Sequence, residues 1–162
     1  MLVRPDTNDE PAAASATLLS LVGRWLGRGK VRLPTLAPHD YKEEIRFAVR
    51  SSASLEYWQR AIDPIDGSLL HAEVGVWRVT PAGLLEISVA FPGATEVAEG
   101  TIDERSIRLL STVVGRAATS LRFAGSARRY DLRENAIAYE IELATVSYPL
   151  AGHLIGEVRR EV

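Results

Sequence analysis

After Gly23 the chain consists of short stretches in which apolar and polar residues alternate, one stretch following another almost to the end. Residues 41–51 (YKEEIRFAVRS) show the pattern, because Ile45 and Phe47 fall on one face and Arg46 on the other. Period-two alternation is typical of a half-buried strand. Turn signals such as Asp66-Gly67 separate these stretches. No helical pattern lies between the later stretches, which disfavours a βαβ architecture.

We predict strands over residues 25–33, 41–51, 55–63, 69–80, 84–91, 95–102, 106–114, 121–132, 136–148 and 153–160. Short connections make successive strands antiparallel neighbours. A meander of this length removes its exposed edges by closing on itself. The sequence therefore predicts an all-β protein, an antiparallel up-and-down β-barrel of about ten strands with room inside for a ligand. A β-sandwich is the alternative architecture.

The first part of the chain differs from the rest. Residues 11–21 (PAAASATLLSL) predict one short N-terminal helix, with Leu18, Leu19 and Val22 facing inward. Residues 1–12 are expected to form a flexible tail, and residues 13–162 a single barrel domain. Trp25, at the entry to the first strand, is expected to close one end of the barrel.

Composition excludes several classes of function. The chain has no cysteine, so disulfides, thiolate catalysis and cysteine-ligated zinc are ruled out. A formal net charge of −2 does not favour binding to nucleic acid or to an anionic membrane. Neither a signal peptide nor an apolar run of the ~20 residues needed to span a bilayer is evident. We expect a cytoplasmic protein with no nucleic-acid or membrane partner.

Four motifs occur in order and cover most of residues 18–160. They are GRWLGRG at 23–29, PT followed by YKEE at 34–44, LHAEVG at 70–75, and VSYPLAGHL at 146–154. In combination these motifs resemble the nitrobindin family of haem-binding β-barrels. The chain departs from the family pattern at Leu121, which stands where the family carries a basic residue near the haem.

The resemblance implies a ferric haem b whose iron takes His153 as its axial ligand, and His153 acts in catalysis through that iron. It also implies isomerisation of peroxynitrite to nitrate, binding of nitric oxide and other small nitrogen-oxide ligands, and it allows a homodimer. Besides His153, the residues expected to contact the haem are His71, Thr35, Gly27, Gly29 and Leu143.

Two other functions stay open. The barrel could carry or sense a small apolar molecule such as a fatty acid, with Arg60, Arg78 or Arg122 binding its carboxylate. It could also lack a ligand and serve in partner recognition, although no exposed apolar patch marks such a surface.

Alternation also predicts where charged side chains lie. Glu43 and Glu44 are adjacent, so they face opposite sides of the sheet and cannot form a carboxylate pair; we expect Glu44 to be solvated. Glu73 is expected to pair with Arg60 or Arg78. We interpret Arg128-Arg129 as surface charge. The face on which His153 lies stays open. If His153 points inward, strict alternation turns Glu157 inward as well, unless a bulge or the end of the strand near Gly156 intervenes.

Overall fold

The computed structural model describes residues 9–33, 36–120, 123–147 and 152–162. These residues form one helix and ten strands. The elements are α1 (Asp9–Ser20), β1 (Gly23–Leu33), β2 (Leu36–Ser51), β3 (Ser54–Ile62), β4 (Leu69–Val79), β5 (Leu85–Phe91), β6 (Ala94–Ile102), β7 (Ser106–Arg116), β8 (Phe123–Arg133), β9 (Ala136–Thr145) and β10 (Gly152–Arg160).

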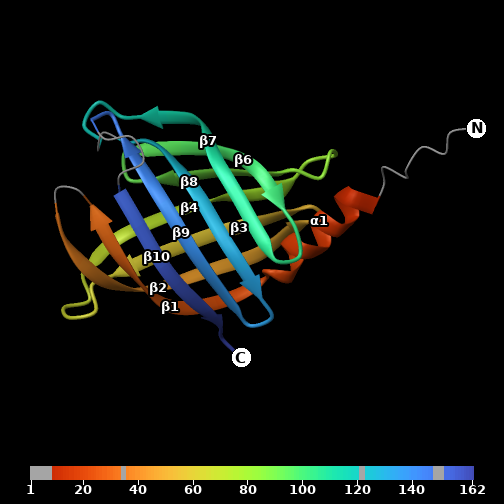
Figure 1. Ribbon diagram of the computed structural model, residues 1–162, viewed down its shortest axis with the longest axis horizontal. Coiled ribbons are helices and arrows are strands. Elements are labelled where there is room, and N and C mark those ends of the chain that lie inside the picture. Colours follow the sequence, from red (N-terminus) through yellow and green to blue (C-terminus); the bar gives the residue numbers. More distant parts are fainter. Residues whose placement is uncertain (1–8, 34–35, 121–122, 148–151) are drawn as a thin grey trace, which may run out of the picture.

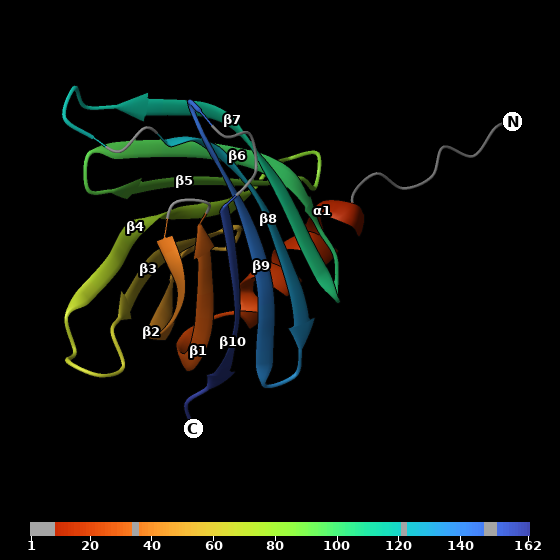
Figure 2. The ribbon, with the colours of Figure 1, turned by 60° about the vertical axis from the view of Figure 1, so that its left-hand side comes forward.

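The strands close into a barrel, as predicted (Figure 1). Each strand pairs antiparallel with the next, and β1 pairs with β10 from Trp25–Arg160 to Arg32–His153. Figure 2 shows these first and last strands side by side. The helix begins at Asp9, inside the segment predicted as a tail, because an acidic residue and Pro11 both suit a first helical turn. Among the described residues, no helix is long and apolar enough to cross a bilayer.

Helix α1 packs over one end of the barrel against β3, β4 and β6. Its buried residues are Ala14 and Leu18, joined just after the helix by Leu21. Trp25 lies beneath the end of the helix, where its Nε1 donates a hydrogen bond to the Leu21 carbonyl at 2.8 Å. The guanidinium of Arg160 lies 4.2 Å from the centroid of the Trp25 ring and donates to the Ser20 and Val22 carbonyls. The expected role of Trp25 in closing this end is confirmed.

The seam between β1 and β10 depends on two glycines that pair across it, Gly29 and Gly156. The ring of Tyr41 lies against Gly29 and the ring of Tyr139 lies against Gly156, so that a Cβ at either glycine would overlap a tyrosine ring. The two tyrosine hydroxyls meet at 2.5 Å. Side chains from β2 and β9 thus join across the inner side of the seam.

Substituting Gly156 by alanine tests this packing. We expect Gly156→Ala to lower the free energy of unfolding by about 1–3 kcal/mol, because the added methyl group displaces the Tyr139 ring from a packed interior. Urea unfolding followed by tryptophan fluorescence measures the change. Arg159→Ala, on the exposed outer face of the same strand, is the control and should change stability by less than ~0.5 kcal/mol. Equal stability of Gly156→Ala and the parent would contradict the account.

Candidate functional site

His153 lies on the outer face of the barrel, near the start of β10. The register of β10 with β9 advances one residue at a time from Gly152 to Arg159, without a bulge. Leu154 packs against the core and Val158 is fully buried, so both face the interior. Strict alternation then places His153 outside, which settles the parity that the sequence left open.

The imidazole of His153 stands between acidic and basic side chains. Its Nε2 contacts a carboxylate oxygen of Glu140 on β9, and about one third of the side chain is exposed. Across the strands, the register partners of His153 are Glu142 on β9 and Arg32 on β1. A carboxylate bonded to one ring nitrogen fixes the orientation of an imidazole and leaves the other nitrogen available as a ligand.

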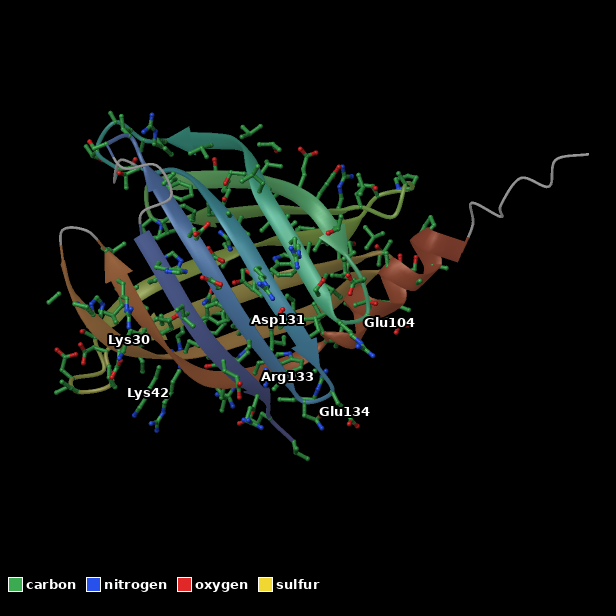
Figure 3. The ribbon with its side chains drawn as sticks, viewed as in Figure 1. Lys30, Lys42, Glu104, Asp131, Arg133 and Glu134 are labelled. Atoms are coloured by element: carbon green, nitrogen blue, oxygen red, sulfur yellow. The ribbon has the colours of Figure 1, made fainter. Side chains whose placement is uncertain are left out.

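A cavity of about 490 Å³, which we call the rim groove, opens beside His153 on the outer side of β1, β2 and β10. Its lining includes His153 and Ile155 of β10, Arg28, Lys30 and Arg32 of β1, Asp40 and Lys42 of β2, and Pro64. Figure 3 shows Lys30 and Lys42 on this side of the barrel. Lys30 pairs with Asp40 at 3.5 Å. Positive charge therefore dominates the groove.

His71 faces the interior, on the same side of β4 as Glu73 and Trp77, which confirms the alternation predicted for this strand. Its ring centroid lies 5.8 Å from that of Phe91, and Phe91 lies 5.1 Å from Phe123. Strands β4 and β10 are separated by β3, β2 and β1 around the barrel. The structure therefore does not bring the two candidate histidines together: His71 is inside and His153 outside.

The other predicted haem contacts are dispersed. Leu143 faces inward on β9 and packs at the edge of the core. Packing explains why positions 27 and 29 are glycines. A Cβ at Gly27 would meet the β10 backbone, and a Cβ at Gly29 would meet the Tyr41 ring. Their contact with haem stays a prediction. Thr35 and Leu121 lie outside the described residues.

A buried ion-pair network crosses the interior, centred on Arg128 of β8. Arg128 binds Glu73 of β4 at 3.0 Å and Glu96 of β6 at 2.5 Å, and its Nε donates to Ser126 at 3.1 Å. All four side chains are at least nine-tenths buried. Burial raises the pKa of the Glu73 carboxyl, but the charges and hydrogen bonds of Arg128 and His71 together outweigh this effect, so the net shift is downward.

The prediction for Arg128-Arg129 was half right. Arg129 is exposed and pairs with Asp131, whereas Arg128 is interior, so its interpretation as surface charge was wrong. Glu73 pairs with Arg128, not with Arg60 or Arg78 as expected. The signal was available in the sequence, because period-two alternation places Arg128 on the same face as Tyr130, a typical interior residue.

Glu43 forms a second buried cluster with residues on three strands. Gln59 donates to one carboxylate oxygen at 2.6 Å, and Tyr139 donates to the other at 2.5 Å. Tyr41 in turn hydrogen-bonds to Tyr139. Burial raises the pKa of Glu43 to about 7, despite these hydrogen bonds to the charged form.

Glu44 faces the outer side, opposite to Glu43, as the adjacency of the two residues predicted. The expectation that it is solvated was wrong, because only 4% of the residue is exposed. Arg24, Arg46 and Arg60 cover it with contacts of 2.5, 2.6 and 3.3 Å. The hydrogen bond from Arg24 is the main reason that the pKa of Glu44 falls to about 2.

The arginines considered for a fatty-acid carboxylate do not supply an interior cation. Arg60 pairs with Glu44, and Arg78 pairs with Glu86 at 2.6 Å; both arginine side chains are at least half exposed. Arg122 lies outside the described residues. Within the described residues, Arg128 is a buried interior cation, and two carboxylates already bind it.

Comparison with known proteins places this geometry in a family. The profile described as "THAP4-like, heme-binding beta-barrel domain" matches residues 14–160. The chain belongs to this family. The match includes both candidate histidines, His71 and His153, and all ten described strands, so the resemblance inferred from the four sequence motifs is confirmed.

Individual members are similar over most of their length. Peroxynitrite isomerase 2 of Mycobacterium avium (strain 104) is 32% identical over 151 residues, which cover 90% of this chain and 94% of that protein. A protein of Arabidopsis thaliana, also named a peroxynitrite isomerase, is 34% identical over 142 residues, covering 86% and 84%. The crystal structure of Rv2717c from M. tuberculosis superposes with a TM-score of 0.84 at 32% identity, covering 92% and 98%.

Because Arg128 is buried and Arg129 is exposed, we expect substitutions of these two adjacent arginines to differ in their effect on stability. Arg128→Ala should lower the free energy of unfolding by about 3–5 kcal/mol, because it leaves Glu73 and Glu96 buried without a counter-charge. Arg129→Ala, the matched control, removes only an exposed pair and should cost less than ~1 kcal/mol. Chemical denaturation measures both. Similar losses in the two variants would refute the assignment.

The raised pKa of Glu43 predicts a pH dependence of stability. A carboxyl whose folded pKa lies above its ordinary 4.5 stabilises the fold fully below pH 4.5, and this contribution is lost as the pH rises to about 7. Relative to Glu43→Gln, the parent should therefore lose up to ~3 kcal/mol of unfolding free energy across that window. Denaturation of both proteins at several pH values measures the difference, in which other titrating groups cancel. A difference independent of pH would contradict the prediction.

Proposed function

We propose that this protein is a haem-dependent enzyme that isomerises peroxynitrite to nitrate, with His153 as the axial ligand of a ferric haem b. Membership of the haem-binding family and the names of the similar proteins support the proposal. The observation that carries the choice of ligand is the position of His153, whose accessible imidazole is bonded to a carboxylate and opens on the rim groove.

The rim groove has part of the chemistry that a haem requires. Haem needs a nitrogen ligand for iron, apolar surface for the porphyrin, and positive charge for its two propionates. His153 supplies the first, and Ile155 and Pro64 supply apolar contacts. The lysine and arginine side chains of β1 and β2 supply the charge. The groove therefore supplies an iron ligand and positive charge, but its two apolar side chains do not enclose a porphyrin.

A bound haem would supply the iron chemistry for the conversion of peroxynitrite to nitrate. The protein contributes the rest. His153 would hold the iron, and Glu140, which contacts its Nε2, would fix the imidazole and increase its basicity as a ligand. The basic side chains of the groove raise the local concentration of anionic peroxynitrite.

The carrier hypothesis receives no support from the described residues. A fatty-acid carrier needs an interior cation that is free to bind a carboxylate, and Arg128 is held by Glu73 and Glu96. A cytoplasmic location, the absence of nucleic-acid and membrane partners, and a homodimer remain predictions from the sequence.

Titration with ferric haem tests the proposal. The parent should show a saturable Soret change at one haem per chain and should accelerate the decay of peroxynitrite to nitrate in the loaded form. His153→Ala should weaken haem binding by at least about tenfold, because iron loses its protein ligand. His71→Ala, which alters the interior histidine only, is the control and should retain the Soret change. Loss of binding in His71→Ala with retention in His153→Ala would place the ligand inside the barrel and refute the assignment.

A further inference from the structure

Two buried polar clusters, one around Glu43 and one around Arg128, are joined by side chains of β3. The Gln59 amide donates from Nε2 to Glu43 at 2.6 Å, and its Oε1 lies 2.6 Å from the Tyr57 hydroxyl. The same hydroxyl lies 2.8 Å from Glu73 Oε1. The joined side chains, which we call the interior row, are in order Tyr41, Tyr139, Glu43, Gln59, Tyr57 and Glu73. All are more than nine-tenths buried, so each hydrogen bond depends on a donor within the barrel.

The Tyr57 hydroxyl carries one hydrogen but faces two acceptors. Gln59 Oε1 and the Glu73 carboxylate both need a donor, and a phenol donates only once. Glu73 is charged, because Arg128 donates to both of its oxygens, so Glu73 supplies no hydrogen of its own. While Gln59 holds Nε2 toward Glu43, one of these two oxygen pairs therefore lacks a hydrogen, which is costly in a buried site.

Exchanging the two ends of the Gln59 amide removes this conflict. Nε2 then donates to Tyr57, and the Tyr57 hydroxyl donates to Glu73. Oε1 turns toward Glu43, and the Glu43 carboxyl supplies the hydrogen for this pair when it is protonated, since Tyr139 bonds to its other oxygen. The five hydrogen bonds of the interior row then have five donors, whereas an ionised Glu43 leaves four.

The surroundings of Glu43 also favour its neutral form. Burial raises the pKa of this carboxyl to about 7. Glu73 and Glu96 already share the positive charge of Arg128, so an ionised Glu43 adds a further buried negative charge. In the described part of the chain, the titratable and charged side chains that face Glu43 or its hydrogen-bond partners are Tyr41 on β2, Tyr57 on β3, His71 and Glu73 on β4, Glu96 on β6, Arg128 and Tyr130 on β8, and Tyr139 on β9.

The tyrosines keep their hydrogens over the range in which Glu43 titrates. Burial raises the pKa of the three tyrosines of the interior row, and it raises the pKa of Tyr130 to about 12. Glu43 is therefore the member of the row that loses its hydrogen near neutral pH.

We propose that Glu43 carries the proton that completes the interior row, and that loss of this proton to water reverses the Gln59 amide. In the protonated state every hydrogen points from Tyr41 toward Glu73. In the ionised state Gln59 donates to Glu43, and Tyr57 serves only one of its two acceptors. Because Glu73 Oε2 lies 3.4 Å from His71 Nε2, this pH-sensitive switch links the β1–β10 seam to the interior histidine. It operates in the protein without a bound cofactor.

NMR spectroscopy of the full chain tests the reversal. The carboxyl carbon of Glu43 and the side-chain amide of Gln59 are followed from about pH 5 to about pH 9. Both signals should move with one midpoint near pH 7, because ionisation of Glu43 turns the amide. In Glu43→Gln the new amide donates at every pH, so the Gln59 signals should stay constant over this range.

Two tyrosine variants test the direction of the interior row. Tyr57 and Tyr41 each lie two hydrogen bonds from Glu43, on opposite sides. Tyr57→Phe removes two hydrogen bonds and one donor, so the row no longer needs the Glu43 proton. The Glu43 midpoint should fall by at least about one pH unit. Tyr41→Phe is the matched control, because it removes one bond and one donor and leaves the proton necessary. Its midpoint should change by less than about half a pH unit.

Circular dichroism and the urea midpoint verify that each variant is folded. A Gln59 amide that does not respond while Glu43 titrates would overturn the reversal, and the parent and Glu43→Gln decide this even where a tyrosine variant does not fold. A midpoint near the ordinary 4.5 in the parent would overturn the requirement for the proton. Equal midpoints in Tyr57→Phe and Tyr41→Phe would overturn the direction of the row, because the effect would then not depend on which donor is lost.

Discussion

Closure between the first and last strands is the constraint on which the rest of the structure depends. A sheet of ten strands has two edges, and only the pairing of β1 with β10 removes them. That pairing is tight because Gly29 and Gly156 face each other and let the rings of Tyr41 and Tyr139 lie against the backbone. The hydroxyls of the two rings meet beneath the seam, and Glu43 is bonded to one of them. Closure and the buried polar cluster are therefore parts of one arrangement.

Closure also explains why the charged side chains of the interior are paired with one another. Once the barrel is shut and α1 covers one end, side chains that face inward can exchange few hydrogen bonds with water. Arg128, Glu73 and Glu96 satisfy one another, as do Glu43, Gln59 and Tyr139. This interior chemistry is separate from the rim groove, whose charged groups face solvent. The described charges inside the barrel thus neutralise one another, whereas the outer groove keeps an excess of positive charge.

The fold could be predicted from the sequence because its signals are local. Period-two alternation and turn residues fixed the type and order of the strands, and the four motifs identified the family. The faces of individual residues could be predicted less well. Alternation placed Glu43 and Glu44 on opposite sides, yet burial of Glu44 needs three arginines that only the folded sheet brings together. Arg128 was misassigned because a doublet of arginines was weighed above its alternation with Tyr130. The orientation of His153 needed the register of β10 with both neighbours.

The position of His153 on β10 has a consequence for the order of events during synthesis. Of the ten strands, β10 is the last to be made, and its partner β1 is the first. The pairing with the greatest sequence separation must then form at the end, which is the slow step in folds rich in non-local contacts. The groove that joins His153 to the cations of β1 and β2 does not exist until that pairing is complete. An incomplete chain can therefore expose its strands but cannot assemble the groove beside His153, which exists only in a barrel that has already closed.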